Sequence, residues 1–359
     1  MKLFSIFLFL FSFKLMAGGV TVTSHVPLKS TYVLLRATSL NSNHQPVVDT
    51  LFFKNGQARS RKALEPGFYQ LDFPGEGKIN IALENKPLDV EIRGKEKKKL
   101  SYDVPSASAS AQIKAYDRYR AEVFNRRVNV LKPQIAQAVR AGDEDEIARL
   151  TSAENAATTA YRHELLQYAR NNMKGLALLY ASIRMDEEKD IAFWQNQAAL
   201  LKKEYPLPVA QLELKLKRYA RLLPGRQAPD FTITDLEGRT VRLSDYSGRW
   251  VLLDFWAAWC LPCRQENINY ARAYAKYKED GFEIVAVSLD TSPKLLKQAI
   301  QRDKAIWKQF SDYKGWDSPA ARLYNVNAIP ANILIDPRGR IVKKNIRGKD
   351  LLDTLEDIF

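Results

Sequence analysis

The chain has 359 residues, of which 46% are hydrophobic and 27% are charged, and its formal net charge is +14. This composition excludes a disordered chain, and the length exceeds that of one ordinary domain, so two or three domains are expected. A basic chain can indicate nucleic-acid binding, but the export signal described next argues against that class.

The N-terminus is typical of a secretory signal peptide. A basic start at Lys2 leads into an apolar stretch up to Phe13 that is roughly a dozen residues long, and Ala17-Gly18-Gly19 are small residues suited to cleavage. The stretch is short for a membrane span. We therefore expect residues 1–19 to be a signal and the mature protein to be soluble and periplasmic. No cysteine stands directly after the expected signal, which argues against a lipid anchor.

Residues 20–103 are predicted to form a small antiparallel β-sandwich. Short β-type segments separated by Gly, Pro and Asn occur at 31–36, 68–73, 79–83 and 88–92. Residues 225–359 hold 21 basic and 18 acidic residues, so about +11 of the net charge lies in the first 224 residues. The densest basic run, 93–99, is either a solvated loop or a site for an acidic partner or an anionic lipid surface.

An α-helical spacer domain is predicted over residues 110–223. After a linker at Pro105 and 106–110, apolar residues recur three and four apart, which favours a helical core over a cofactor site. Gly142 is expected to end one helix, and Asp143 and Asp145 to cap the next. The predicted helical segments are 112–141, 143–172, one that begins at 176–180, 186–205 and 208–223.

Residues 225–359 are predicted to form an α/β domain with a central sheet, because strand-like and helix-like segments alternate. The predicted strands are 231–234, 240–243, 250–255, 282–287, 331–335 and 340–346. The predicted helices follow Cys260 to about residue 277, cover 293–302, and begin at 349.

The only two cysteines of the chain, Cys260 and Cys263, follow the apolar segment 250–255 directly. That segment reads as a buried parallel strand, so the pair falls at a strand-to-helix turn, where the helix N-terminus favours a thiolate on the first sulfur. A structural disulfide would close too small a loop to stabilise much, and a zinc site would need further Cys or His ligands that the sequence does not cluster. The motif therefore indicates thiol–disulfide exchange, with no metal or added cofactor.

The segment from Val251 to Cys263, which contains Trp-Cys-Leu-Pro-Cys, closely resembles the thioredoxin superfamily. Together with 225–238, Glu266 and Asn327-Ala328-Ile329-Pro330, it is similar to the TlpA/ResA branch of exported thiol–disulfide oxidoreductases. The resemblance covers 225–359 and implies a thioredoxin-like fold there. Residues 1–224 resemble multidomain relatives only in layout.

The resemblance implies roles for individual residues. Cys260 is expected to be the attacking thiolate and Cys263 the resolving one. Pro330 is expected to be cis, which leaves the Ile329 backbone free to pair with an extended substrate. Asp254 matches the buried acid that assists proton transfer at the deeper cysteine, and burial should raise its pKa. The alternative for Asp254 is a hydrogen-bonded structural carboxylate.

Four further residues lie in or near the motif. Glu266 matches an acid beside the active site in ResA-like proteins, with a surface glutamate as the alternative. Trp256 and Trp259 are expected to pack under and beside the disulfide, with substrate contact by Trp259 second. Arg264 is expected to be a solvated arginine, although it could favour the Cys260 thiolate.

The resulting hypothesis is a periplasmic oxidoreductase that reduces disulfides of exported proteins and is reset by a membrane thiol donor, with cytochrome c maturation as one context. A disulfide oxidase or isomerase is the alternative direction. A peroxidase is disfavoured, because Ala257 stands where peroxiredoxins need threonine and Leu253 stands where they need proline. A partner-binding scaffold that uses the N-terminal domains is the alternative from another class.

Overall fold

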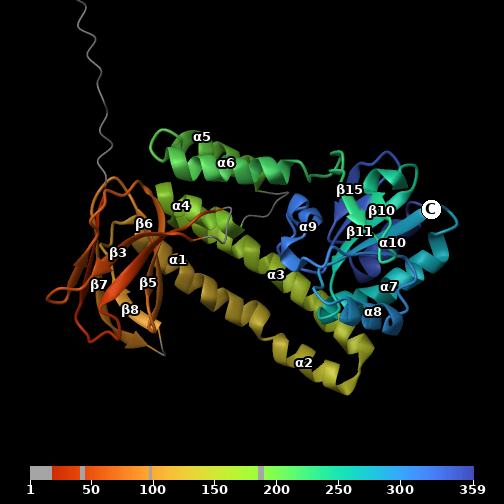
Figure 1. The fold of residues 1–359 in the computed structure, drawn as a ribbon, viewed down its shortest axis with the longest axis horizontal. Coiled ribbons are helices and arrows are strands. Elements are labelled where there is room, and N and C mark those ends of the chain that lie inside the picture. Colours follow the sequence, from red (N-terminus) through yellow and green to blue (C-terminus); the bar gives the residue numbers. More distant parts are fainter. Residues whose placement is uncertain (1–17, 41–44, 97–98, 185–189) are drawn as a thin grey trace, which may run out of the picture. The chain divides into compact units, whose positions relative to one another are not determined.

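The computed structural model describes residues 18–40, 45–96, 99–184 and 190–359 (Figure 1). The chain divides into two compact units, each of which is described by itself. One unit comprises 1–122, 162–185 and 192–215, and the other comprises 123–161, 186–191 and 216–359. Most of the predicted signal, residues 1–17, lies outside the described residues.

The first unit contains two four-stranded sheets that share one hydrophobic core. Their orders are β4-β1-β7-β8 and β3-β2-β5-β6. Alternate residues of each strand face the core, as Val33 and Leu35 do on the second strand. The strands are β1 Val20–Ser24, β2 Tyr32–Ala37, β3 Val47–Phe52, β4 Gln57–Arg59, β5 Gly67–Phe73, β6 Gly77–Leu83, β7 Leu88–Glu96 and β8 Lys99–Asp103.

The predicted β-sandwich is confirmed, but the prediction that all of its strands pair antiparallel was wrong. β1 pairs with β7 in parallel, with Val22 opposite Val90. Parallel neighbours need a long connection, and the whole second sheet supplies it. Local patterning does not carry this information, because it shows which residues are buried and not which strands become neighbours.

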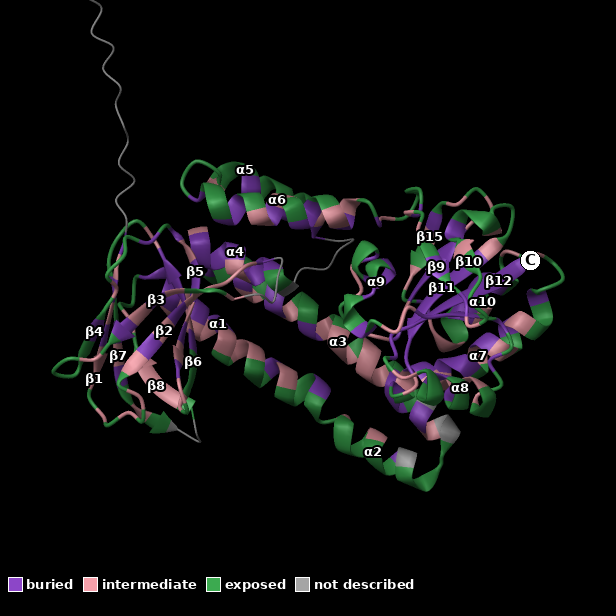
Figure 2. Ribbon diagram, in the orientation of Figure 1, coloured by how far each residue is buried: buried purple, intermediate pink, exposed green. Residues whose placement is uncertain are grey.

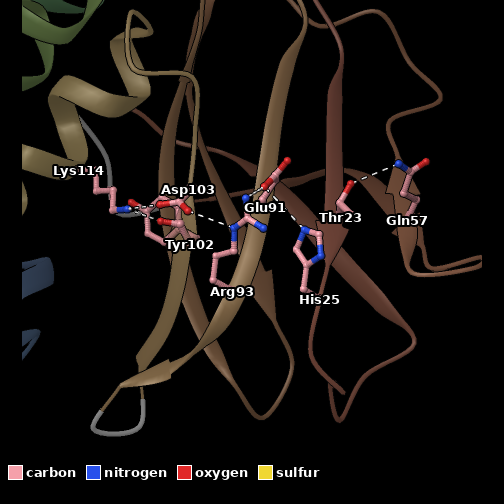
Figure 3. A network of polar contacts seen from close by, with 8 residues as sticks. All are labelled: Thr23, His25, Gln57, Glu91, Arg93, Tyr102, Asp103 and Lys114. Carbon is pink, nitrogen blue, oxygen red and sulfur yellow. Dashed lines mark hydrogen bonds and ion pairs between the residues drawn. The ribbon is translucent and has the colours of Figure 1, made fainter.

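A row of polar contacts joins the strands on one side of the β4-β1-β7-β8 sheet (Figure 3). Glu91 pairs with Arg93 and has its Oε2 3.7 Å from Nε2 of His25. Nε of Arg93 lies 3.2 Å from Asp103, and Nζ of Lys114 lies 3.3 Å from the same carboxylate. Arg93, the first residue of the basic run 93–99, therefore forms its ion pairs with Glu91 and Asp103 of the same sheet.

The helical region is close to the predicted one. The predicted helix 112–141 is two helices, because a π-helical turn at Asn125–Asn129 interrupts it. Asp143 caps the next helix by accepting the Glu146 N–H at 3.0 Å, and Gly142 adopts a φ of 68°. The expected linker is shorter, because a helix begins at Ala109. The helices are α1 Ala109–Phe124, α2 Lys132–Ala141, α3 Glu144–Asn172, α4 Gly175–Ala181, α5 Ile191–Leu201 and α6 Pro206–Ala220.

The C-terminal domain is a five-stranded mixed sheet of order β13-β12-β11-β14-β15 with helices, which confirms the predicted α/β class. Figure 2 shows buried residues along its central strands, and β12 is buried throughout because sheet and helices exclude water from both faces. A hairpin of β9 Thr232–Thr234 and β10 Thr240–Arg242 precedes the sheet. The other elements are β11 Trp250–Trp256, α7 Leu261–Tyr277, β12 Phe282–Ser288, α8 Pro293–Arg302, β13 Lys308–Phe310, α9 Pro319–Leu323, β14 Ala331–Ile335, β15 Ile341–Lys344 and α10 Gly348–Glu356.

The strand β13 and the helix α9 were not predicted, since each is too short for a periodic pattern. In the described part of the chain, no helix combines the length and the apolar character needed to cross a membrane.

Candidate redox site

The two cysteines form a disulfide at the point where β11 leads into α7. Cys260 is the N-cap residue of α7, and its Sγ accepts the Cys263 backbone N–H at 3.2 Å. Pro262 stands in the first turn of the helix, where its missing N–H costs nothing. Both cysteines are buried. The sulfur expected to attack therefore lies among the unpaired N–H groups of a 17-residue helix, which favour a negative charge there.

A buried carboxylate holds the loop before the cysteines in place. Asp290 accepts the Ala258 backbone N–H at 2.8 Å and the Ser288 hydroxyl at 2.8 Å. Sequence reasoning missed Asp290. Its position could have indicated it. Asp290 follows β12 and the cysteines follow β11, and the carboxyl ends of these neighbouring parallel strands meet at one edge of the sheet.

Pro330 follows a cis peptide bond, as predicted, and leads into β14, which pairs antiparallel with β11. Pro330 is buried and Ile329 is half-buried. The guanidinium of Arg347 donates to the Pro330 carbonyl oxygen, a contact that the sequence did not indicate. Substrate pairing by the Ile329 backbone stays a prediction.

Asp254 is 1% exposed and lies in a buried hydrogen-bonded chain. The Tyr270 hydroxyl donates to its Oδ1 at 3.0 Å, and the Asn332 amide donates to the tyrosine oxygen at 2.9 Å. Burial raises the pKa of Asp254 to about 7, while the Tyr270 bond and the Arg347 charge oppose the rise and the Glu266 charge adds to it. The predicted direction of the pKa shift is confirmed.

Glu266 is buried, so its alternative as a surface glutamate was wrong. Its Oε2 accepts the Gly348 backbone N–H at 3.0 Å and the Asn269 amide at 3.3 Å. Gly348 begins α10, so the carboxylate satisfies an N–H that the helix itself cannot pair. These contacts fix α7 to α10, and a role of Glu266 in the reaction stays a prediction.

The two tryptophans before the disulfide have different surroundings. Trp256 is buried as expected, and its indole N–H donates to Gln309 at 3.1 Å. Trp259 is 57% exposed, so the expectation that it mainly packs was wrong. Its ring centroid lies 6.2 Å from that of Trp316, which is also exposed at 47%. Two exposed aromatic rings therefore lie beside the redox motif.

Arg264 is neither a solvated arginine nor a partner of the cysteines. Its Nε lies 3.1 and 3.0 Å from the two carboxylate oxygens of Asp303, and Nη2 makes a further contact with that carboxylate. The Asn267 amide also donates to Asp303, at 3.0 Å. The sequence could not reveal this ion pair, because the residues are 39 positions apart.

Among the residues that the structure describes, no three His, Cys, Asp or Glu side chains lie together so that they could hold a metal ion. The groups present at the site are a disulfide at a helix N-terminus, a cis proline and a buried acid with a raised pKa. Together they can carry out thiol–disulfide exchange and the proton transfer that accompanies it.

Comparison with known proteins gives the same chemistry. The model of the AhpC/TSA family matches residues 224–344. The thiol-disulfide oxidoreductase ResA of Bacillus thuringiensis subsp. konkukian is 34% identical over 133 residues, which cover 37% of this chain and 75% of that protein. ResA of Oceanobacillus iheyensis is 38% identical over 136 residues, with 37% and 69% covered.

Among solved structures, the thioredoxin domain of a thiol-disulfide oxidoreductase from Bacteroides vulgatus is 39% identical, with 38% of this chain and 98% of that chain covered and a TM-score of 0.37. This chain thus belongs to the ResA family of thiol-disulfide oxidoreductases, with a thioredoxin-like fold in its C-terminal third and the Cys260–Cys263 disulfide as its redox group.

Proposed function

We propose that the protein is a periplasmic reductant of disulfides in exported proteins, and that a membrane thiol donor resets it. The observation that carries this proposal is the Cys260–Cys263 pair at the N-terminus of α7, in a domain that also has a cis peptide bond before Pro330 and whose relatives are thiol-disulfide oxidoreductases. The apolar N-terminal stretch supports export.

The reaction moves two electrons through the cysteine pair. In the reduced protein the Cys260 thiolate attacks a substrate disulfide, forms a mixed disulfide and expels one substrate thiolate. Cys263 loses its proton and attacks the Cys260 sulfur, which releases the second substrate thiolate and forms the Cys260–Cys263 disulfide. The two substrate thiolates take up protons from water, so the substrate leaves as a dithiol. A donor dithiol then reverses these two exchanges on the protein and is itself oxidised.

The buried acid has a place in the second exchange. A carboxyl group with a pKa near 7 can accept a proton at neutral pH and return it when the protein is reduced again. We propose Asp254 as the group that takes the Cys263 proton. The hydrogen bond from the Tyr270 hydroxyl to Oδ1 of Asp254 fixes the orientation of this carboxylate.

Whether the protein reduces or oxidises its substrates depends on the reduction potential of the Cys260–Cys263 couple, so oxidase and isomerase activities are the competing outcomes. The potential can be measured by equilibrating the purified protein with glutathione buffers. A value nearer that of thioredoxin, about −270 mV, than that of a strong periplasmic oxidant, about −120 mV, is expected for a reductant. A value at the oxidising end contradicts the proposed direction.

A trapping experiment tests the mechanism and identifies the substrates. Cys263→Ala should retain mixed disulfides with exported proteins in cells, because the resolving attack is lost, whereas Cys260→Ala should retain none. Captured cytochrome maturation factors would assign the protein to haem attachment. If both variants retained equal amounts of mixed disulfide, the assignment of Cys260 as the attacking and Cys263 as the resolving cysteine would be contradicted.

The first 224 residues are proposed to dock a partner. Their excess positive charge favours an acidic one. However, Lys95 lies 2.6 Å from Glu76 and Arg93 pairs with Glu91 and Asp103, so part of the basic run 93–99 is neutralised within the sheet. If deletion of 20–103 abolished the phenotype and Cys260→Ser left it unchanged, the scaffold hypothesis would replace the redox one.

A further inference from the structure

A shallow groove lies beside Leu261, the residue that directly follows the attacking cysteine. Its volume is about 350 Å³, at the lower end of ligand pockets. Four of its lining residues come from the helical region and the fifth from the redox motif: Lys132, Ile135 and Ala136 of α2, Glu154 of α3, and Leu261 at the start of α7. We refer to it as the α2–Leu261 groove.

The spacing of these residues explains how two helices build one wall. Lys132, Ile135 and Ala136 follow the i, i+3, i+4 pattern, so they share one face of α2. On α3, Glu154 shares a face with Thr151 and Asn155 by the same pattern. Each helix therefore turns a single face toward the groove.

Hydrogen bonds attach that face of α3 to the redox site. The buried Thr151 hydroxyl donates to Oε1 of Gln265 on α7 at 3.2 Å. Nη1 of Arg347 donates to Oδ1 of Asn155 at 2.6 Å, and the same guanidinium donates to the Pro330 carbonyl oxygen. The α3 face is thus bonded both to the cysteine helix and to the arginine that holds the cis-proline strand.

The chemistry of the groove fits an apolar side chain. Ile135, Ala136 and Leu261 supply apolar surface, and 38% of Leu261 is exposed. Lys132 and Glu154 supply one charge of each sign, so neither a cationic nor an anionic side chain is favoured overall.

The occupant follows from continuity with the redox site. A substrate disulfide must reach the Cys260 sulfur, and Leu261, which lines the groove, is the next residue along the chain. An extended polypeptide presents neighbouring side chains to such pockets. Resting on the proposed function, we propose that the α2–Leu261 groove binds an apolar side chain next to the reactive cysteine of a polypeptide substrate. The helical region thereby selects substrates, and this part of the chain lies outside the matched residues 224–344.

The test uses the full chain and two peptides, each joined to glutathione through a single cysteine. One peptide has leucine on both sides of the cysteine and the other has serine. The reduced wild-type protein should show a kcat/KM at least about tenfold higher for the leucine peptide, as burial of one apolar side chain allows. Ala136→Glu places a carboxylate in the groove, and it should lower that ratio to about 3 or less, because the ionised group opposes burial of an apolar side chain.

Gln137→Glu is the matched control, because it adds the same charge one position along α2, on a different side of the helix. It should keep the wild-type ratio, and circular dichroism should show both variants folded. The groove proposal is overturned if the wild-type protein reduces both peptides with equal kcat/KM. It is also overturned if Ala136→Glu has the same ratio of kcat/KM for the leucine peptide to that for the serine peptide as the wild type. A wild-type protein that reduces neither peptide nor glutathione disulfide overturns the proposed function instead.

Discussion

Asp254 shows how one buried residue links stability to the proposed chemistry. It interrupts the apolar strand β11 and is 1% exposed, so its ionised form is costly. The Tyr270 hydroxyl donates a hydrogen bond to it, which stabilises the ionised form but does not outweigh burial. The side chain is therefore close to the balance between its two protonation states at neutral pH.

This balance predicts a pH-dependent stability. The folded-state pKa is about 7 against an ordinary value of 3.8, so the folded protein binds a proton that the unfolded chain releases between these values. The stabilisation from Asp254 is present below about pH 4 and is lost as the pH rises through 7. Its size is about 4 kcal/mol, because a difference of one between the folded and unfolded pKa values corresponds to about 1.36 kcal/mol.

Asp254→Asn cannot ionise and should remove this dependence. The free energy of unfolding of the variant, minus that of the wild type, should increase by a few kcal/mol, and at most about 4 kcal/mol, from about pH 4 to about pH 8. Urea denaturation of the oxidised proteins across this range measures the difference. A difference that stays constant with pH would mean that Asp254 is ionised throughout.

At the scale of elements, α7 joins the cysteines to the rest of the domain. Its buried residues include Cys263, Glu266, Asn267 and Tyr270, so this helix buries several polar groups whose partners lie on other elements. Glu266 reaches α10, Tyr270 reaches β11, and Arg264 reaches Asp303 after α8. These bonds fix the orientation of the helix whose N-terminus holds the disulfide.

The Arg264–Asp303 pair offers a test at this scale. The side chain of Asp303 is 7% exposed and that of Arg264 is 19% exposed. Arg264→Met leaves the aspartate buried without its cation, which should cost about 3 kcal/mol of the free energy of unfolding. Chemical denaturation of the oxidised protein at neutral pH measures the loss.

Arg272→Met is the control on the same helix. Arg272 is exposed, so its replacement should change the free energy of unfolding by about 0.5 kcal/mol or less. Equal effects of the two substitutions would show that the ion pair contributes nothing beyond ordinary surface charge.

For the whole molecule, the chain contains two compact units with separate hydrophobic cores. One core lies in the sandwich and includes Val33 and Leu71, and the other surrounds the mixed sheet and includes Leu252 and Ile284. Chains with separate cores commonly depart from two-state unfolding. Reactivity of the disulfide should accordingly depend on the stability of the second unit.

Calorimetry of the oxidised protein should therefore resolve two transitions. Arg264→Met should lower the midpoint of one of them by several degrees and leave the other in place, because the substitution lies in one unit. A single transition that shifts as a whole would show that the units unfold together.

Much of the fold was predictable because local patterns carry it. Alternation gave four of the eight sandwich strands, β2, β5, β6 and β7, and missed β1, β3, β4 and β8. The apolar run 250–255 followed by two cysteines gave β11 and the start of α7. The same run placed Cys260 at a helix N-terminus, and the Ile329-Pro330 segment gave the cis proline through resemblance. These are properties of adjacent residues, so no long-range information was needed.

Pairings between distant residues were decided only by the tertiary structure. Tyr270 and Asn332 reach Asp254, Arg347 reaches Pro330, and Asp290 holds Ala258, across separations that no periodicity encodes. The sequence by itself determined which residues are reactive and which elements carry them, because hydrophobic spacing and the cysteine motif are local. The folded chain decided their partners, burial and access, because electrostatic and packing energies depend on distances in space.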